Sequence, residues 1–241
     1  MAAERRHSRR DGGWGQATES LANVEFRRVF IGNMAFFLAM GGQGIVRPWL
    51  AYELTDSTFA LGIVTAAMAV PMFFFSPVGG VLADRVERRR LIVVAQALAM
   101  ATEAVVLALL LGGQLEFWHL VAAAASLGCC FPLVMPARSA IVFDLVGRRG
   151  LGAAMALNMT GVNVTRVVGP ASAGYLISLI DVEGAYIVNL VLYGIALSAM
   201  LTVRRLPPPP GAKDHSITKN LLEGFRYLGQ DRLVLIPVSY T

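Results

Sequence analysis

Residues 79–90 read Gly-Gly-Val-Leu-Ala-Asp-Arg-Val-Glu-Arg-Arg-Arg and separate two long apolar runs, 58–83 and 91–112. Glycines at the end of the first run allow two helices to pack closely. Asp84 follows at the end of that helix, where a carboxylate can pair with a neighbouring helix N-terminus or with an arginine. The stretch therefore predicts a short polar link between two helices that cross a membrane.

The composition of the whole chain supports a membrane protein. Hydrophobic residues make up 56% of the 241 residues, charged residues make up 15%, and the mean hydropathy is +0.59. A soluble domain carries about 25% charged residues, and a membrane-spanning helix needs about 20 apolar residues. A seventh apolar run begins near residue 233, after six runs that reach this length: 29–52, 58–83, 91–112, 117–142, 151–179 and 184–203.

The distribution of Lys and Arg indicates an orientation. Six of the 21 basic residues precede the first run, four lie in the link between the second and third runs, and six follow residue 203. Two more lie in the link between the fourth and fifth runs, whereas the other three links are short and contain none. Because Lys and Arg favour the cytoplasmic side, we predict a cytoplasmic N-terminus and three external links in the plasma (inner) membrane.

On this basis the chain divides into four regions. Residues 1–28 form a basic cytoplasmic tail without an apolar signal segment, either solvated or in contact with anionic lipid head groups. Residues 29–203 form a six-helix transmembrane bundle. Residues 204–232 form a cytoplasmic connector, which begins with a stiff run of prolines and continues with the apolar spacing of an amphipathic helix. Residues 233–241 begin a seventh transmembrane helix.

A proline with small residues occurs near one end of two different runs. The run 58–83 ends with Ser-Pro-Val-Gly-Gly, and the run 151–179 contains Gly169, Pro170 and Gly174. The predicted orientation places these two ends on opposite sides of the membrane, as a 3+3 inverted repeat requires. Pro and Gly are also frequent in membrane helices, where small residues permit close packing, so a chance similarity is the alternative.

The link at 79–90 resembles the signature that the major facilitator superfamily carries at this place in the chain. Glu87 stands where the signature prefers glycine, and the positions that match are Gly80, Leu82, Ala83, Asp84, Arg85, Arg88 and Arg89. The resemblance implies that this motif is a conformational switch, in which the aspartate latches the two halves of a transporter in one state. The alternative is that the arginines serve only to fix the orientation.

Further stretches, at 49–55, 136–140, 156–158 and 163–170, resemble the enterobactin-exporter-like branch of that superfamily. The resemblance implies an all-α membrane protein, in which this chain is the six-helix N-terminal bundle of a twelve-helix fold and the C-terminal six-helix half is a missing partner. It also implies a secondary transporter that exports a small siderophore- or drug-like molecule by alternating access, with H⁺ as the driving ion.

Three charged residues lie well inside the apolar runs: Arg47, Glu103 and Arg166. A charge at mid-bilayer costs about 2.5–3.5 kcal/mol, so it usually faces protein or water. At about 1.5 Å per residue, Glu103 and Arg166 both lie about 20 Å from the cytoplasmic side. We therefore predict a buried ion pair between them, with Glu103 as a candidate proton site. Arg47 is either buried or extends its long side chain to the external surface.

Polar residues form stripes on the first and fifth runs. Asn33, Gln43 and Arg47 share the first stripe, and Asn158 and Arg166 share the second. Such stripes indicate either a water-filled cavity that contacts a substrate or hydrogen bonds between packed helices.

Other classes of function find little support in the sequence. The three histidines lie far apart, and the chain has no phosphate-binding loop and no nucleophile–base set, so we predict no enzyme activity, cofactor, metal or nucleic-acid partner. The competing interpretation is a truncated or partner-dependent six-helix scaffold that does not transport. Because residues 233–241 reach only about 13 Å into the membrane, we expect the 241 residues not to move a small-molecule substrate alone.

Overall fold

The computed structural model describes residues 20–83 and 86–205, and every regular element within them is a helix. The helices are α3 (Val24–Thr55), α4 (Thr58–Ala83), α5 (Arg88–Leu111) and α6 (Phe117–Thr202). Non-helical backbone interrupts α6 at Gly147, Ile180 and Asp181. We therefore divide α6 into a first segment (117–146), a second segment (148–179) and a third segment (182–202).

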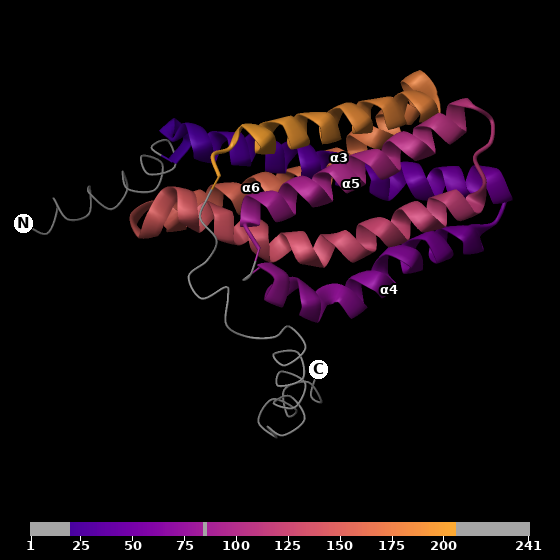
Figure 1. The fold of residues 1–241 in the computed structure, drawn as a ribbon. Coiled ribbons are helices and arrows are strands. Elements are labelled where there is room, and N and C mark those ends of the chain that lie inside the picture. The colour runs from indigo at the N-terminus through magenta and orange to yellow at the C-terminus, as the bar shows by residue number, and fades with distance from the viewer. Residues whose placement is uncertain (1–19, 84–85, 206–241) are drawn as a thin grey trace, which may run out of the picture.

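The six helical segments run side by side in an elongated bundle (Figure 1). α4 lies at the edge of the bundle, whereas α6 packs against α3, α4 and α5. Five stretches of the described chain are long and apolar enough to cross a membrane, and the last of them, Gly150–Thr202, contains two helical segments. The six apolar runs of the sequence therefore correspond to six helical segments, which confirms the predicted all-α membrane fold.

Local chemistry explains where the segments begin and end. Asn23 caps α3, because its side-chain oxygen accepts hydrogen bonds from the backbone nitrogens of Glu25 (3.0 Å) and Phe26 (3.3 Å). The first helix therefore begins five residues earlier than the apolar run 29–52 predicts. Gly147 has a φ of 70°, a left-handed conformation that glycine adopts readily, and it ends the first segment of α6.

Apolar side chains fill the interior and also cover the outside of the bundle. The core contains three buried clusters, one with Leu50, one with Phe36 and one with Phe26. On the outer surface, Phe73 is 76% exposed and Val167 is 72% exposed. Large apolar side chains on both sides of a helix are expected where the solvent is lipid, so the burial pattern supports the membrane assignment.

The second segment of α6 crosses α3 at two glycines. A Cβ atom on Gly169 would lie 2.9 Å from the carbonyl oxygen of Leu38, and one on Gly41 would lie 3.3 Å from Cδ of Pro170. Gly174 has open space at the corresponding position. Gly169 and Pro170 therefore lie at a helix crossing, whereas Gly174 does not.

Two regions predicted from the sequence fall mainly outside the described residues. Residues 1–19 of the predicted tail lie outside the described residues. Residues 206–241 also lie outside them, and they include most of the predicted connector and the predicted start of a seventh span.

Candidate functional site

The bundle buries an ion pair between α3 and α5. Arg47 donates a hydrogen bond through Nη2 to Oε1 of Glu103, and the two residues are 3% and 0% exposed. Tyr186, on the third segment of α6, interacts electrostatically with Arg47 and is also fully buried. At 1.5 Å per residue, Arg47 lies about 12 Å from Thr55 and Glu103 lies about 12 Å from Leu111. Both of these helix ends precede predicted external links. We call Arg47, Glu103 and Tyr186 the outer polar layer.

This pairing corrects the ion pair that depth alone predicts. Glu103 binds Arg47, and Arg166 is exposed on the second segment of α6. Arg47 is buried and does not extend to the external surface. The error has a simple cause: counting residues gives the depth of a side chain along its helix but not the direction in which that side chain points.

A second polar group lies nearer the opposite end of the bundle. Arg138, on the first segment of α6, donates a hydrogen bond through Nη1 to Oδ1 of Asn33. The side-chain nitrogen of Asn33 donates in turn to Oδ1 of Asn158 at 3.0 Å. Gln96 joins them in the amide orientation that satisfies its neighbours, because its oxygen then accepts from Arg138 at 2.9 Å. We call Arg138, Asn33, Asn158 and Gln96 the inner polar layer.

Arg138 is a buried cation held without a carboxylate among the described residues. It is 3% exposed, and its guanidinium carbon lies 4.1 Å from the ring centroid of Phe36. The ion pairs of the described chain do not include it. A cation over an aromatic ring gains about 2 kcal/mol or more when both are desolvated, which partly offsets the cost of burial.

The sequence prediction missed Arg138 as a site residue. It lies near the end of the apolar run 117–142, close to the basic link that follows, where a positive charge is expected from the orientation alone. The signal was present, because an arginine inside an apolar run must find polar partners. Asn33 and Gln96 lie at comparable distances from the starts of their own helices, about 12–14 Å at 1.5 Å per residue.

A polar stripe on the third segment of α6 begins in the outer polar layer, at Tyr186, and runs toward the inner polar layer. Tyr186, Asn189 and Tyr193 follow one another at helical spacing and are all buried. The ring of Tyr193 packs edge-on against Phe36 at a centroid distance of 5.7 Å. The hydroxyls of both tyrosines have no hydrogen-bond partner in the described part of the chain. The stripe therefore connects the outer and inner polar layers through the core.

Arginines tie the helices together at the end where α5 begins. Arg88 donates a hydrogen bond through Nη1 to Oδ2 of Asp144. Arg89 donates to the carbonyl oxygen of Leu201 at 2.7 Å, and Arg28 donates to that of Thr202 at 2.9 Å. Cations favour the last carbonyl groups of a helix, so the two arginines stabilise the end of the third segment of α6.

These contacts show where part of the predicted switch motif lies in the fold. Arg88 and Arg89 hold two segments of α6, and Gly80 lies within α4. Asp84 and Arg85 lie outside the described residues. Asp144, the partner of Arg88, was not singled out from the sequence, because nothing in its immediate neighbours distinguishes it from a solvated acidic residue.

The bundle contains a cavity of about 270 Å³ beside the outer polar layer, between α3, α4 and the first segment of α6. Gln43 and Arg47 line it, together with Met40, Met68 and Met72. A larger hollow of about 860 Å³ opens beside Trp49 and Asp181. Within the described ranges, no three His, Cys, Asp or Glu residues are placed to hold a metal ion.

A lipid-facing bundle of six helices with buried polar layers and an arginine-rich link has the architecture of one half of a secondary transporter. A family model described as a transmembrane secretion effector matches residues 16–236, and the chain belongs to this family of the major facilitator superfamily. The family membership confirms the resemblance that the link at 79–90 carries.

Individual relatives agree with the family. The enterobactin exporter EntS of Shigella boydii serotype 18 is 32% identical to this chain over 220 residues, which cover 87% of this chain and 50% of that protein. The enterobactin exporter EntS of Escherichia coli O157:H7 gives the same identity and coverage. The chain therefore spans about half the length of the curated relatives it matches, and it is an integral membrane protein of a transporter family.

Proposed function

We propose that the whole protein exports a small molecule across the plasma (inner) membrane by alternating access, with the proton gradient as its energy source. The observation that carries this proposal is the pair of buried polar layers inside a lipid-facing bundle. Buried charges are costly in a membrane, and they mark substrate or proton pathways. The named activity of the relatives supports export, and Glu103 is the carboxylate that we assign to proton coupling.

A second bundle belongs to this proposal. Transporters with inverted repeats hold their substrate between two bundles that rock against each other. Arg166 and Asn163 are exposed on the second segment of α6, about 20 Å or more from either end of that segment at 1.5 Å per residue. Polar groups at this depth need protein or water as a neighbour. We propose that a C-terminal six-helix half covers this face.

Transport in vesicles tests the proposed function. Inside-out vesicles that contain the whole protein should accumulate a siderophore- or drug-like substrate from a panel when an inward-acidic proton gradient is imposed. A protonophore should abolish the accumulation, and vesicles without the protein provide the background. Saturable uptake that is insensitive to the protonophore would contradict proton coupling. The absence of uptake across the whole panel would contradict the export proposal.

The switch motif gives a second test of the same proposal. Asp84→Asn in the whole protein should leave folding intact and slow transport by about tenfold, as expected if the charge favours one conformational state by about 1.4 kcal/mol. Glu87→Gln removes a nearby carboxylate outside the matched signature positions and should transport at the normal rate. The measurement is the initial rate of vesicle uptake, normalised to the amount of folded protein. A normal rate for Asp84→Asn would exclude the latch.

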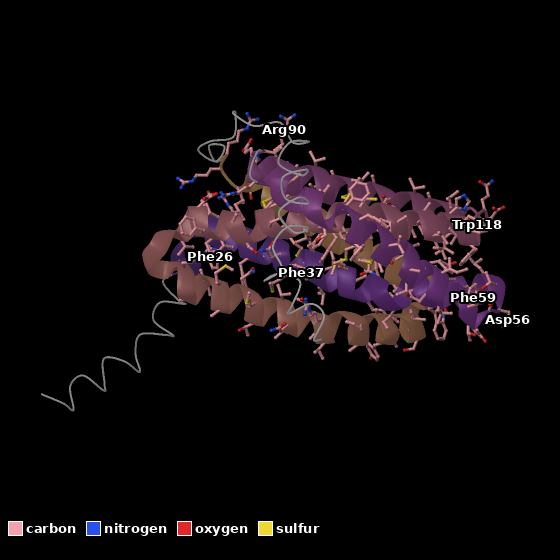
Figure 2. All side chains as sticks on the ribbon, turned by 90° about the horizontal axis from the view of Figure 1, so that it is seen from below. Phe26, Phe37, Asp56, Phe59, Arg90 and Trp118 are labelled. Atoms are coloured by element: carbon pink, nitrogen blue, oxygen red, sulfur yellow. The ribbon has the colours of Figure 1, made fainter. Side chains whose placement is uncertain are left out.

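The orientation can be measured by cysteine labelling. Asp56 and Glu116 are exposed near one end of the bundle and Arg90 is exposed near the other; Figure 2 shows Asp56 and Arg90 toward opposite ends. In a background that lacks Cys129 and Cys130, Asp56→Cys and Glu116→Cys should react with an impermeant maleimide from outside the cell. Arg90→Cys should react only after permeabilisation. The reverse pattern would overturn the predicted orientation.

A further inference from the structure

A groove of about 380 Å³ follows the outside of the bundle between α5 and the first segment of α6. Leu98, Ala101, Val105 and Ala122 line it and are exposed, so the groove opens on the surface that meets lipid. On the α5 side it extends from Leu98 to Leu109, about 16 Å at 1.5 Å per residue. That length matches one leaflet, which is half of a hydrocarbon core of about 30 Å.

The two hydroxyl groups in this groove are already hydrogen-bonded to the helices that carry them. Thr102 donates to the carbonyl oxygen of Leu98 at 2.9 Å, and Ser126 donates to that of Ala123 at 3.0 Å. The hydrocarbon core of a bilayer offers no water to fill such a groove, and an empty groove would lose dispersion contacts along its walls. A linear apolar chain from the surrounding bilayer is therefore the occupant that the groove fits.

His119 lines the groove near the start of the first segment of α6. Its neighbour Trp118 is 67% exposed, lies toward the same end of the bundle as Asp56 (Figure 2), and suits the membrane–water interface. Nδ1 of His119 accepts a hydrogen bond from the backbone nitrogen of Glu116 at 3.0 Å, so the hydrogen of the neutral ring is on Nε2. Nε2 has no hydrogen-bond partner among the described residues, and it can donate to a lipid phosphate at this interface.

The charges at this end of the bundle distinguish between lipid head groups. Glu116 is exposed and is the N-cap residue of α6, three residues before His119. The other two links at this end contain Asp56 and Asp181, and none of the three links contains Lys or Arg. A head group with only a negative charge finds no cation in these links, whereas a head group that also carries an ammonium can donate a charge-assisted hydrogen bond to Glu116.

We propose that this groove binds one acyl chain of a zwitterionic phospholipid with a primary ammonium, phosphatidylethanolamine. The lipid phosphate accepts a hydrogen bond from Nε2 of His119, and the ammonium binds the carboxylate of Glu116. The lipid occupies the leaflet on the side of the link 112–116, which is the external leaflet in the predicted orientation. The site lies outside both polar layers, so it goes beyond the proposed function and does not depend on what the protein transports.

Photo-crosslinking of the whole protein in phosphatidylcholine nanodiscs tests the proposal. The probe is phosphatidylethanolamine with a diazirine in one acyl chain, and its match is phosphatidylglycerol with the same chains. Peptide mass spectrometry should locate the phosphatidylethanolamine label on residues 98–109 and 122–126. The phosphatidylglycerol probe should label these residues about two- to fivefold less, the ratio that an ion pair of modest strength at an interface gives.

Paired variants separate the acyl chain from the head group. Ala122→Leu fills the groove and should remove most of the label there, whereas Ala108→Leu is the matched control at an exposed alanine that does not line the groove. His119→Asn keeps an acceptor at the place of Nδ1 for the backbone of Glu116 but loses the outer donor, so the preference for phosphatidylethanolamine should fall to near one. His119→Gln keeps a donor near the place of Nε2 and should retain the preference.

The comparison of the two probes on the unmodified protein needs no variant, so the test remains valid if a variant does not fold. Label spread evenly over the lipid-facing surface would overturn the site, as would equal labelling of Ala122→Leu and Ala108→Leu. Equal labelling of the groove by the two probes would overturn the assignment of the head group. A loss of preference in His119→Gln but not in His119→Asn would show that His119 only caps the helix, and it would also overturn that assignment.

Discussion

Replacing Arg47 with leucine should lower the free energy of unfolding by about 3–5 kcal/mol, and adding Glu103→Leu should recover most of that loss. The single substitution leaves the carboxylate of Glu103 buried at 0% exposure with no cation beside it. Glu103→Leu alone likewise leaves the guanidinium of Arg47 buried without a carboxylate beside it. The double variant removes both charges and replaces them with apolar groups that the surrounding core tolerates.

The measurement is a double-mutant cycle on unfolding in detergent. The two single losses should sum to several kcal/mol more than the loss of the double variant. Arg166→Leu is a matched control, because Arg166 is an exposed arginine outside the ion pairs of the described chain and should change the stability of this chain little. If the Arg47 and Glu103 losses simply added, the pair would not be a unit. A coupling between Glu103 and Arg166 would instead restore the pair predicted from depth.

The helices could be predicted because the length of an apolar run is enough to identify a membrane-spanning helix. A bilayer requires about 20 apolar residues per helix, and each of the six runs has them, so length alone identifies the spans. The ends are less certain for a local reason. Asn23 starts α3 before the apolar run begins, by accepting hydrogen bonds from two backbone nitrogens.

The site could be predicted only in part, because it depends on which helix faces which. The polar stripe on the first run includes Asn33 and Arg47, and the stripe on the fifth run includes Asn158. Their partners required the fold: Asn33 meets Asn158 across two helices, and Arg47 meets Glu103 on α5. A lipid-facing helix has apolar residues all round, so its sequence carries little information on which face points inward.

Arg138 is a further example in which the sequence does not show the direction of a side chain. A positive charge near the end of a span is used to assign orientation, and that use does not depend on whether the side chain is buried. In the fold, Arg138 turns inward to Asn33 and Phe36. Basic residues near span ends therefore have to be tested for partners on other helices before they are taken as surface charges.

A single added methyl group should be enough to separate α4 from the first segment of α6. A Cβ atom on Gly79 would overlap the carbonyl oxygen of Pro132, and one on Gly128 would overlap the carbonyl oxygen of Met68. In both cases the obstacle is backbone, which cannot move aside as a flexible side chain does. We expect Gly79→Ala and Gly128→Ala each to cost at least about 1–3 kcal/mol, the usual cost of overpacking.

Gly62→Ala is the matched control on α4, because a Cβ atom there would meet nothing within 4 Å. Alanine is favoured over glycine inside a helix by about 0.5–1 kcal/mol, so this variant should be neutral or slightly more stable. The midpoint of thermal unfolding in detergent and the yield of folded protein report all three variants. A Gly128→Ala protein as stable as Gly62→Ala would show that α4 and the first segment of α6 are not in close backbone contact.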